Sequence, residues 1–115
     1  MANRHRGERA LMLGGDVFTL RPSFEALEAA CDDTGLGLPL LAGTIKSPHW
    51  RPSHLLALVK RTMIAAGHKP PEDLSGLLVG AGLLNVAETV EEMLQFALID
   101  APPGNSEAPS DGTTA

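Results

Sequence analysis

The chain has 115 residues, 43% hydrophobic and 20% charged, so it is long enough to bury one core and too short for two. Its formal net charge of −5 disfavours binding to a phosphate backbone, and its single cysteine excludes an internal disulfide. With no uninterrupted apolar run of about 20 residues, it is not expected to cross a membrane. We therefore expect one soluble domain in a reducing cytosol.

The first predicted element is a β-hairpin that follows a flexible basic segment, residues 1–7. Residues 8–13 and 17–21 have the length of strands, and the GGD between them supplies the positive-φ positions of a tight turn. Side-chain alternation gives each strand one apolar face for the core. A lone hairpin buries too little surface to be stable, so we expect it to lie on the helices or to pair with another chain.

Helices are predicted to follow the hairpin up to residue 99. Pro22 and Ser23 form a helix start and Gly35 a left-handed stop, while Ser53 is the expected N-cap of a later amphipathic helix. Apolar spacing of three and four residues predicts the others, and Gly80 and Gly82 break the pattern between the last two. The expected helices cover 23–35, 38–43, 53–66, 71–79 and 85–99.

The fold class is therefore mainly α with an N-terminal β-hairpin (α+β), a small bundle of four to five helices. A single domain covers residues 8–99, and residues 100–115 lack hydrophobic residues to bury and are expected to be disordered. One shared core is expected to contain Phe18, Leu20, Phe24, Leu27, Leu58, Met63, Val90 and Leu94.

The sequence predicts no catalytic, cofactor or metal site. Cys31, His49 and His54 are residue types that bind metals or act as nucleophiles, yet their spacing matches no metal or catalytic motif, and Cys31 lies on an apolar helix stripe. Gly80 and Gly82 form a G-x-G without the strand and third glycine of a dinucleotide site. Adjacent carboxylates in the helices diverge around the axis. We therefore expect no enzyme.

Several short motifs follow one another from Asn3 to Leu38. They are a basic NRHRGE segment, a strand, a glycine turn, a strand ending in Leu-Arg-Pro, then Phe-x-x-Leu and Thr-Gly-x-Gly-Leu. With PPEDLSGLLVGAGL over residues 70–83, this pattern resembles the gene transfer agent family of small phage tail proteins over about residues 3–99. That family is classed with phage tail assembly chaperones and is sometimes labelled a tail tube protein. The loop KSPHWRPS departs from the family pattern.

The resemblance implies a protein of tail morphogenesis in the cytoplasm of a bacterial host. As a tail assembly chaperone it would coat the long helical tape-measure protein before the tube forms. Alternatively it is a structural tube component retained in the virion, in which the hairpin extends a ring by edge pairing. A third alternative, a helix-turn-helix regulator that reads DNA with residues 53–66, is disfavoured by the acidic charge. The expected partners are the tape-measure protein, other tail proteins or a second copy, with neither nucleic acid nor membrane.

The last predicted helix carries more apolar residues than one stripe accounts for. Phe96 and Ile99 lie off its main stripe and are expected to be exposed. Together with Leu83, Leu84 and the outer face of the hairpin, they are the predicted partner-binding patch. The alternative is that a thicker bundle buries all of them.

Overall fold

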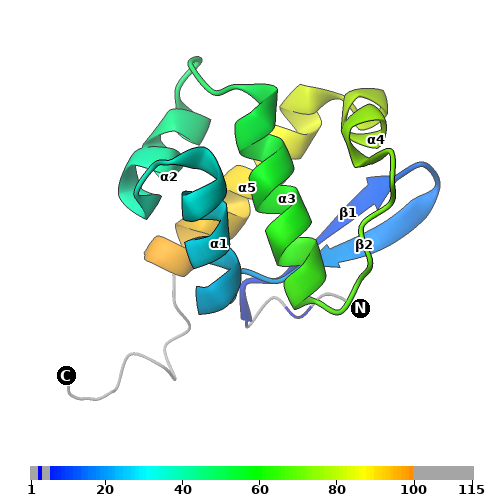
Figure 1. Cartoon of the computed structure of the whole chain (residues 1–115), viewed down its shortest axis with the longest axis horizontal. Helices are drawn as coiled ribbons and strands as arrows, with labels where there is room; N and C mark the ends of the chain where they lie inside the picture. Colours follow the sequence, from blue (N-terminus) through cyan, green and yellow to red (C-terminus); the bar gives the residue numbers. More distant parts are fainter. Residues whose placement is uncertain (1–2, 4–5, 100–115) are drawn as a thin grey trace.

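A computed structural model describes residue 3 and residues 6–99. Within this range a two-stranded antiparallel hairpin precedes five helices, which confirms the predicted fold class (Figure 1). The tail predicted to be disordered, residues 100–115, lies outside the described residues. The elements are β1 (Arg9–Leu13), β2 (Asp16–Leu20), α1 (Phe24–Thr34), α2 (Leu38–Lys46), α3 (Pro52–Ala65), α4 (Leu74–Ala81) and α5 (Leu83–Leu98).

The hairpin packs on the helices through one face. Gly14 and Gly15 form its two-residue turn with φ of 60° and 88°, the positive values that a tight hairpin turn requires. Met12 and Val17 pair directly across the strands on the outer face and are exposed. The inner face contacts α3, α4 and α5, as expected for a hairpin too small to stand alone. Its buried side chains are Leu11, Leu13 and Leu20.

The chain itself covers outward-facing backbone groups of the hairpin. The Thr19 N–H donates to His68 Nε2 at 3.0 Å, and two residues further on the Arg21 N–H donates to the Thr62 carbonyl at 2.9 Å. Because alternate N–H groups of a paired strand point to the same side, both bonds lie on the edge of β2 that faces away from β1. That edge is therefore occupied where an added strand would pair.

Helix α1 begins and ends where the sequence predicts. The Ala26 N–H donates to Ser23 Oγ at 3.1 Å, and Gly35 ends the helix with φ of 75°. Ala26 and Ala30 are buried, and α1 packs against α3. The prediction that Phe24 lies in the core is wrong, because Phe24 is 78% exposed. It lies about 120° around the helix axis from Ala30, outside the face that α3 covers.

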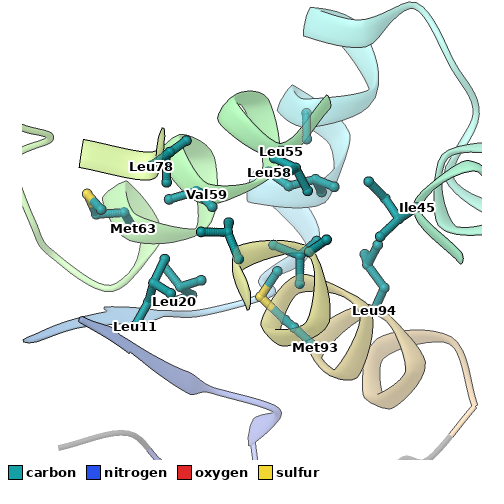
Figure 2. Packing of buried hydrophobic residues seen from close by; sticks show 14 of the residues in the cluster. Leu11, Leu20, Ile45, Leu55, Leu58, Val59, Met63, Leu78, Met93 and Leu94 are labelled. Atoms are coloured by element: carbon teal, nitrogen blue, oxygen red, sulfur yellow. The ribbon is translucent and has the colours of Figure 1, made fainter. Parts of the chain in front are cut away.

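Helix α3 lies between the hairpin and the other helices, and with α5 it supplies most of the core (Figure 2). It begins at Pro52, whose fixed φ suits a first helical position, so the expected N-cap role of Ser53 is wrong. Arg51 is the N-cap, and its N–H donates to His54 Nδ1 at 3.0 Å. The buried side chains of α3 are Leu55, Ala57, Leu58, Val59, Thr62 and Met63.

The predicted core is confirmed apart from Phe24. Phe18 and Leu27 are partly buried and pack against the cluster. Figure 2 shows hairpin side chains pointing toward α3 and α5, and Ile45 of α2 facing Leu94 of α5. The fully or almost fully buried members that the sequence predicts are Leu20, Leu58, Met63, Val90 and Leu94.

Helices α4 and α5 meet at a sharp bend. The bend lies at Gly82, whose φ is 89°, while Gly80 stays inside α4. No single helix in residues 6–99 has the length and apolar character needed to span a membrane. Only α4 and α5 taken together meet that criterion, and they are bent by 98°.

Candidate partner-binding groove

The four residues of the predicted patch lie at three different places. Leu84 and Ile99 are 77% and 70% exposed. Leu83 is partly buried and packs against the core. Phe96 is half-buried, and its ring lies directly over the backbone of Gly7. Phe96 is therefore a packing residue, although it lies off the main stripe of α5.

Leu84 and Ile99 both line a groove between α2 and α5, two helices that lie side by side (Figure 1). The groove consists of two adjacent hollows of about 210 and 410 Å³, and Lys46 and Glu91 line both of them. Leu84 and Ile99 are fifteen positions apart, which corresponds to about 22 Å along a helix axis, or about four turns. We call this surface the α2–α5 groove, lined by Ala42, Gly43, Ile45, Lys46, Ser47, Pro48, Trp50, Leu84, Ala87, Glu88, Glu91, Leu94, Gln95, Leu98 and Ile99.

Two neighbouring stripes of α5 explain how one helix serves both the core and the groove. The stripe through Val90 and Met93 is buried in the core. A second stripe, with Leu84, Glu91 and Leu98 spaced by seven residues, faces the groove. The sequence pattern did not reveal the second stripe, because acidic residues in its middle interrupt the apolar spacing.

The α2 side of the groove combines small residues with an aromatic end. Ala42 and Gly43 leave space above α5, since neither carries a side chain larger than a methyl group. Ile45 is buried and faces Leu94 at the base of the groove (Figure 2). Trp50 is half-buried near Leu84. Trp50 belongs to the loop KSPHWRPS, for which the sequence predicts no site.

The charged residues of the groove lie in its middle, between two apolar ends. Glu88 and Glu91 come from α5 and Lys46 from α2. Within residues 6–99, no ion pair or hydrogen bond engages any of these three side chains. The groove is thus apolar at its two ends and mainly acidic between them.

A second apolar hollow, of about 240 Å³, lies between α3, α4 and α5. Leu56 and Leu83 line it, and the exposed Val79 stands at its rim. It is shorter than the α2–α5 groove and has no charged lining residue. It is the location of Leu83, away from Leu84 and Ile99.

The family-like motifs at the two ends of the hairpin meet at a buried carboxylate. Glu8 is only 3% exposed, and it accepts hydrogen bonds from the Asn3 N–H and from Arg21 Nε, both at 2.7 Å. Arg6 Nη1 lies 3.9 Å from the same carboxylate. Burial alone would raise the pKa of Glu8, but the hydrogen bonds and the charges of Arg21 and Arg6 outweigh burial and lower the pKa below its ordinary value. This arrangement ties the NRHRGE segment to the Leu-Arg-Pro motif.

The residues considered for chemistry do not converge. Among residues 6–99 and Asn3, no three His, Cys, Asp or Glu side chains are placed to hold a metal ion. Cys31 is half-buried, and burial, followed by the nearby Glu28 and Asp32, raises the pKa of its thiol. A raised pKa lowers the thiolate fraction and with it the nucleophilicity.

Helix α3 is poorly placed to read DNA. Its apolar face is buried in the core, and its exposed face carries few basic residues. Its Arg61 is bound to Asp33 through two hydrogen bonds of 2.7 and 3.0 Å. The regulatory alternative therefore gains no support from the fold.

A comparison with protein families gives a match over residues 6–102, to a family model described as phage tail tube protein, GTA-gp10. The matched range includes the hairpin, all five helices described above and every residue that lines the α2–α5 groove. Neither the curated proteins nor the solved structures gave a match.

Proposed function

Because the chain belongs to the GTA-gp10 family of phage tail tube proteins, it is a phage or gene transfer agent tail protein, and we propose that it acts as a tail assembly chaperone for the tape-measure protein. The α2–α5 groove is the observation that carries this proposal. It is long, open and apolar at both ends, which suits a helix better than a compact ligand.

The dimensions of the groove fit a segment of an extended helical partner. A helix of about four turns would span it from Leu84 to Ile99. Apolar residues near the two ends of such a helix would cover the exposed side chains of Leu84 and Ile99, which otherwise face water. A tape-measure protein, being long and helical, would offer many such segments to several copies of the chaperone.

A structural role in the tube is the second candidate. It is favoured by the family description and by the exposed Met12–Val17 pair on the outer face of the hairpin. Ring extension through the β2 edge is opposed by the bonds from Thr19 to His68 and from Arg21 to Thr62, which occupy that edge. We therefore favour the chaperone role.

Co-expression with a tape-measure segment tests the proposal. Leu84→Asp and Ile99→Asp should each leave the segment insoluble while the variant keeps its circular dichroism spectrum. Phe24→Asp is the matched control, since Phe24 is similarly exposed and does not line the groove. Phe96 is unsuitable for this test because its ring packs on Gly7. A segment that stays soluble with both groove variants would contradict the proposal.

Composition of the finished particle separates the two candidate functions. A chaperone should be absent from purified tails, whereas a tube component should be present in many copies. Mass spectrometry of purified particles measures this directly, with a major tail protein as the internal reference. Stoichiometric recovery of this chain in tails would favour the structural role.

A further inference from the structure

Resting on the proposed function, we infer that the α2–α5 groove selects a partner helix that is basic in its middle and apolar at both ends. The order of side chains along α5 carries this inference. Leu84 lies at one end and Leu98 and Ile99 at the other. Glu88 and Glu91 lie between them, one and two helical turns from Leu84.

The acidic centre of the groove has a physical consequence for binding. Seating a helix over Glu88 and Glu91 removes water from two carboxylates, which is unfavourable unless the helix supplies positive charge. Lys46 on the facing helix is one positive charge for two negative ones. A lysine or arginine on the partner would balance the second carboxylate, whereas an acidic partner would add repulsion.

A second copy of this chain does not supply such a helix among the described residues. The adjacent basic pair Lys60 and Arg61 lies on α3, whose apolar face is buried in the core. Arg61 is moreover bound to Asp33. A basic helical segment of the tape-measure protein is therefore the occupant we assign to the groove.

Two helical peptides test this assignment with the folded full-length chain. Both carry a leucine near each end of one face, and between the leucines one peptide has three lysines and the other three glutamates. Trp50 is the only tryptophan of the chain and lines the groove, so its fluorescence reports binding. The lysine peptide should bind at least about tenfold more tightly at low salt, and the preference should shrink as salt screens the charges.

Paired variants show whether the preference comes from the groove. Glu88→Gln combined with Glu91→Gln should remove most of the preference for the lysine peptide. Glu25→Gln combined with Glu28→Gln makes the same change of charge at the same spacing on α1 and should leave the preference intact. Both variants should keep the wild-type circular dichroism spectrum, since all four glutamates are exposed or half-exposed.

The outcomes separate this inference from the proposed function. Equal binding of the two peptides, or a preference that persists in the Glu88→Gln and Glu91→Gln variant, overturns the inference. In that case the wild type is compared with Leu84→Asp in the co-expression experiment. If only the wild type keeps the tape-measure segment soluble, the chaperone role is supported and the charge preference is not. If neither peptide binds and the segment is not solubilised, both fail. The chain alone could also form a dimer that the Leu84→Asp substitution converts to monomers. That result would assign the groove to a second copy and would also overturn the inference.

Discussion

Gly7 joins the beginning of the described chain to its last helix. Its φ is +77°, a value that residues with a Cβ rarely adopt. A Cβ at this position would overlap the ring of Phe96, including Cγ, which lies 2.8 Å away. The ring or the backbone would therefore have to shift to admit the Cβ. Gly7 is therefore required both by its backbone conformation and by the close packing of α5.

We expect Gly7→Ala to destabilise the fold more than an alanine at another positive-φ glycine. Gly15 has φ of 88° and open space around it. Gly15→Ala should therefore lower the free energy of unfolding by only about 1 kcal/mol, the cost of placing an alanine in a left-handed backbone conformation. Gly7→Ala should lower the free energy of unfolding by about 1–3 kcal/mol more than Gly15→Ala, because the added Cβ clashes with the Phe96 ring. Urea denaturation of the two variants measures the difference. In a Phe96→Ala background the excess should disappear, and an excess that persists would argue against the ring contact.

Glu8 makes the stability of the hairpin depend on pH. Glu8→Gln should lower the free energy of unfolding by about 2 kcal/mol near neutral pH, since charge-assisted hydrogen bonds from Arg21 and Asn3 are weakened. The pKa of Glu8 is lowered in the fold from its ordinary value of 4.5. Its contribution is therefore fully present above pH 4.5 and is lost as the pH falls through the lowered pKa.

The difference between wild type and Glu8→Gln across pH measures this effect. The gap in unfolding free energy should be constant above pH 4.5 and narrow below it. Asp33, whose pKa is lowered chiefly by its hydrogen bond from Arg61, changes both proteins equally and cancels in the comparison. A gap of constant size down to the acid unfolding transition would show that Glu8 is not paired as described.

At the scale of the element, α1 shows how a helix can keep its predicted bounds while its buried face is shifted. The Ser23 and Gly35 signals are local, so the sequence predicts them well. The buried face depends on where α3 lies, and α3 approaches the small Ala26 and Ala30 side chains instead of Phe24. The bulkiest residue of the first turn is therefore left in solvent.

Phe24→Ala and Leu58→Ala test this assignment of faces. Phe24→Ala should change the free energy of unfolding by less than about 0.5 kcal/mol, because the ring has little buried surface to lose. Leu58→Ala should cost about 2–5 kcal/mol, because Leu58 is fully buried on α3. Chemical denaturation midpoints give both values. A Phe24→Ala loss as large as that of Leu58→Ala would place the ring in the core after all.

Helix α5 shows which part of the site is readable from sequence and which is not. Its buried stripe has regular apolar spacing and was predicted, including Val90 and Leu94. Its groove stripe consists of Leu84 and Leu98 separated by glutamates, and it gains meaning only because α2 lies alongside. Packing of Phe96 on Gly7 is likewise a contact between residues 89 positions apart, which periodicity within one helix cannot indicate.

At the scale of the whole molecule, all the buried hydrophobic residues of the core lie within the described residues 6–99. Deletion of Ala101–Ala115 should leave the melting temperature nearly unchanged, because this segment has almost no apolar surface to bury. Differential scanning calorimetry of the deleted and full-length chains measures the effect. A loss of many degrees would show that the segment docks on the domain.

The contact between Gly7 and Phe96 also has a consequence for synthesis on the ribosome. The hairpin is translated first, yet its inner face packs on α3, α4 and α5, and Gly7 meets its partner only in the last helix. At about 5–20 residues per second, the intervening residues take roughly 5–20 seconds to appear. During that interval the helices that cover Leu11, Leu13 and Leu20 appear one after another, α3 first and α5 last. The nascent hairpin is thus fully packed only after the last helix has been synthesised.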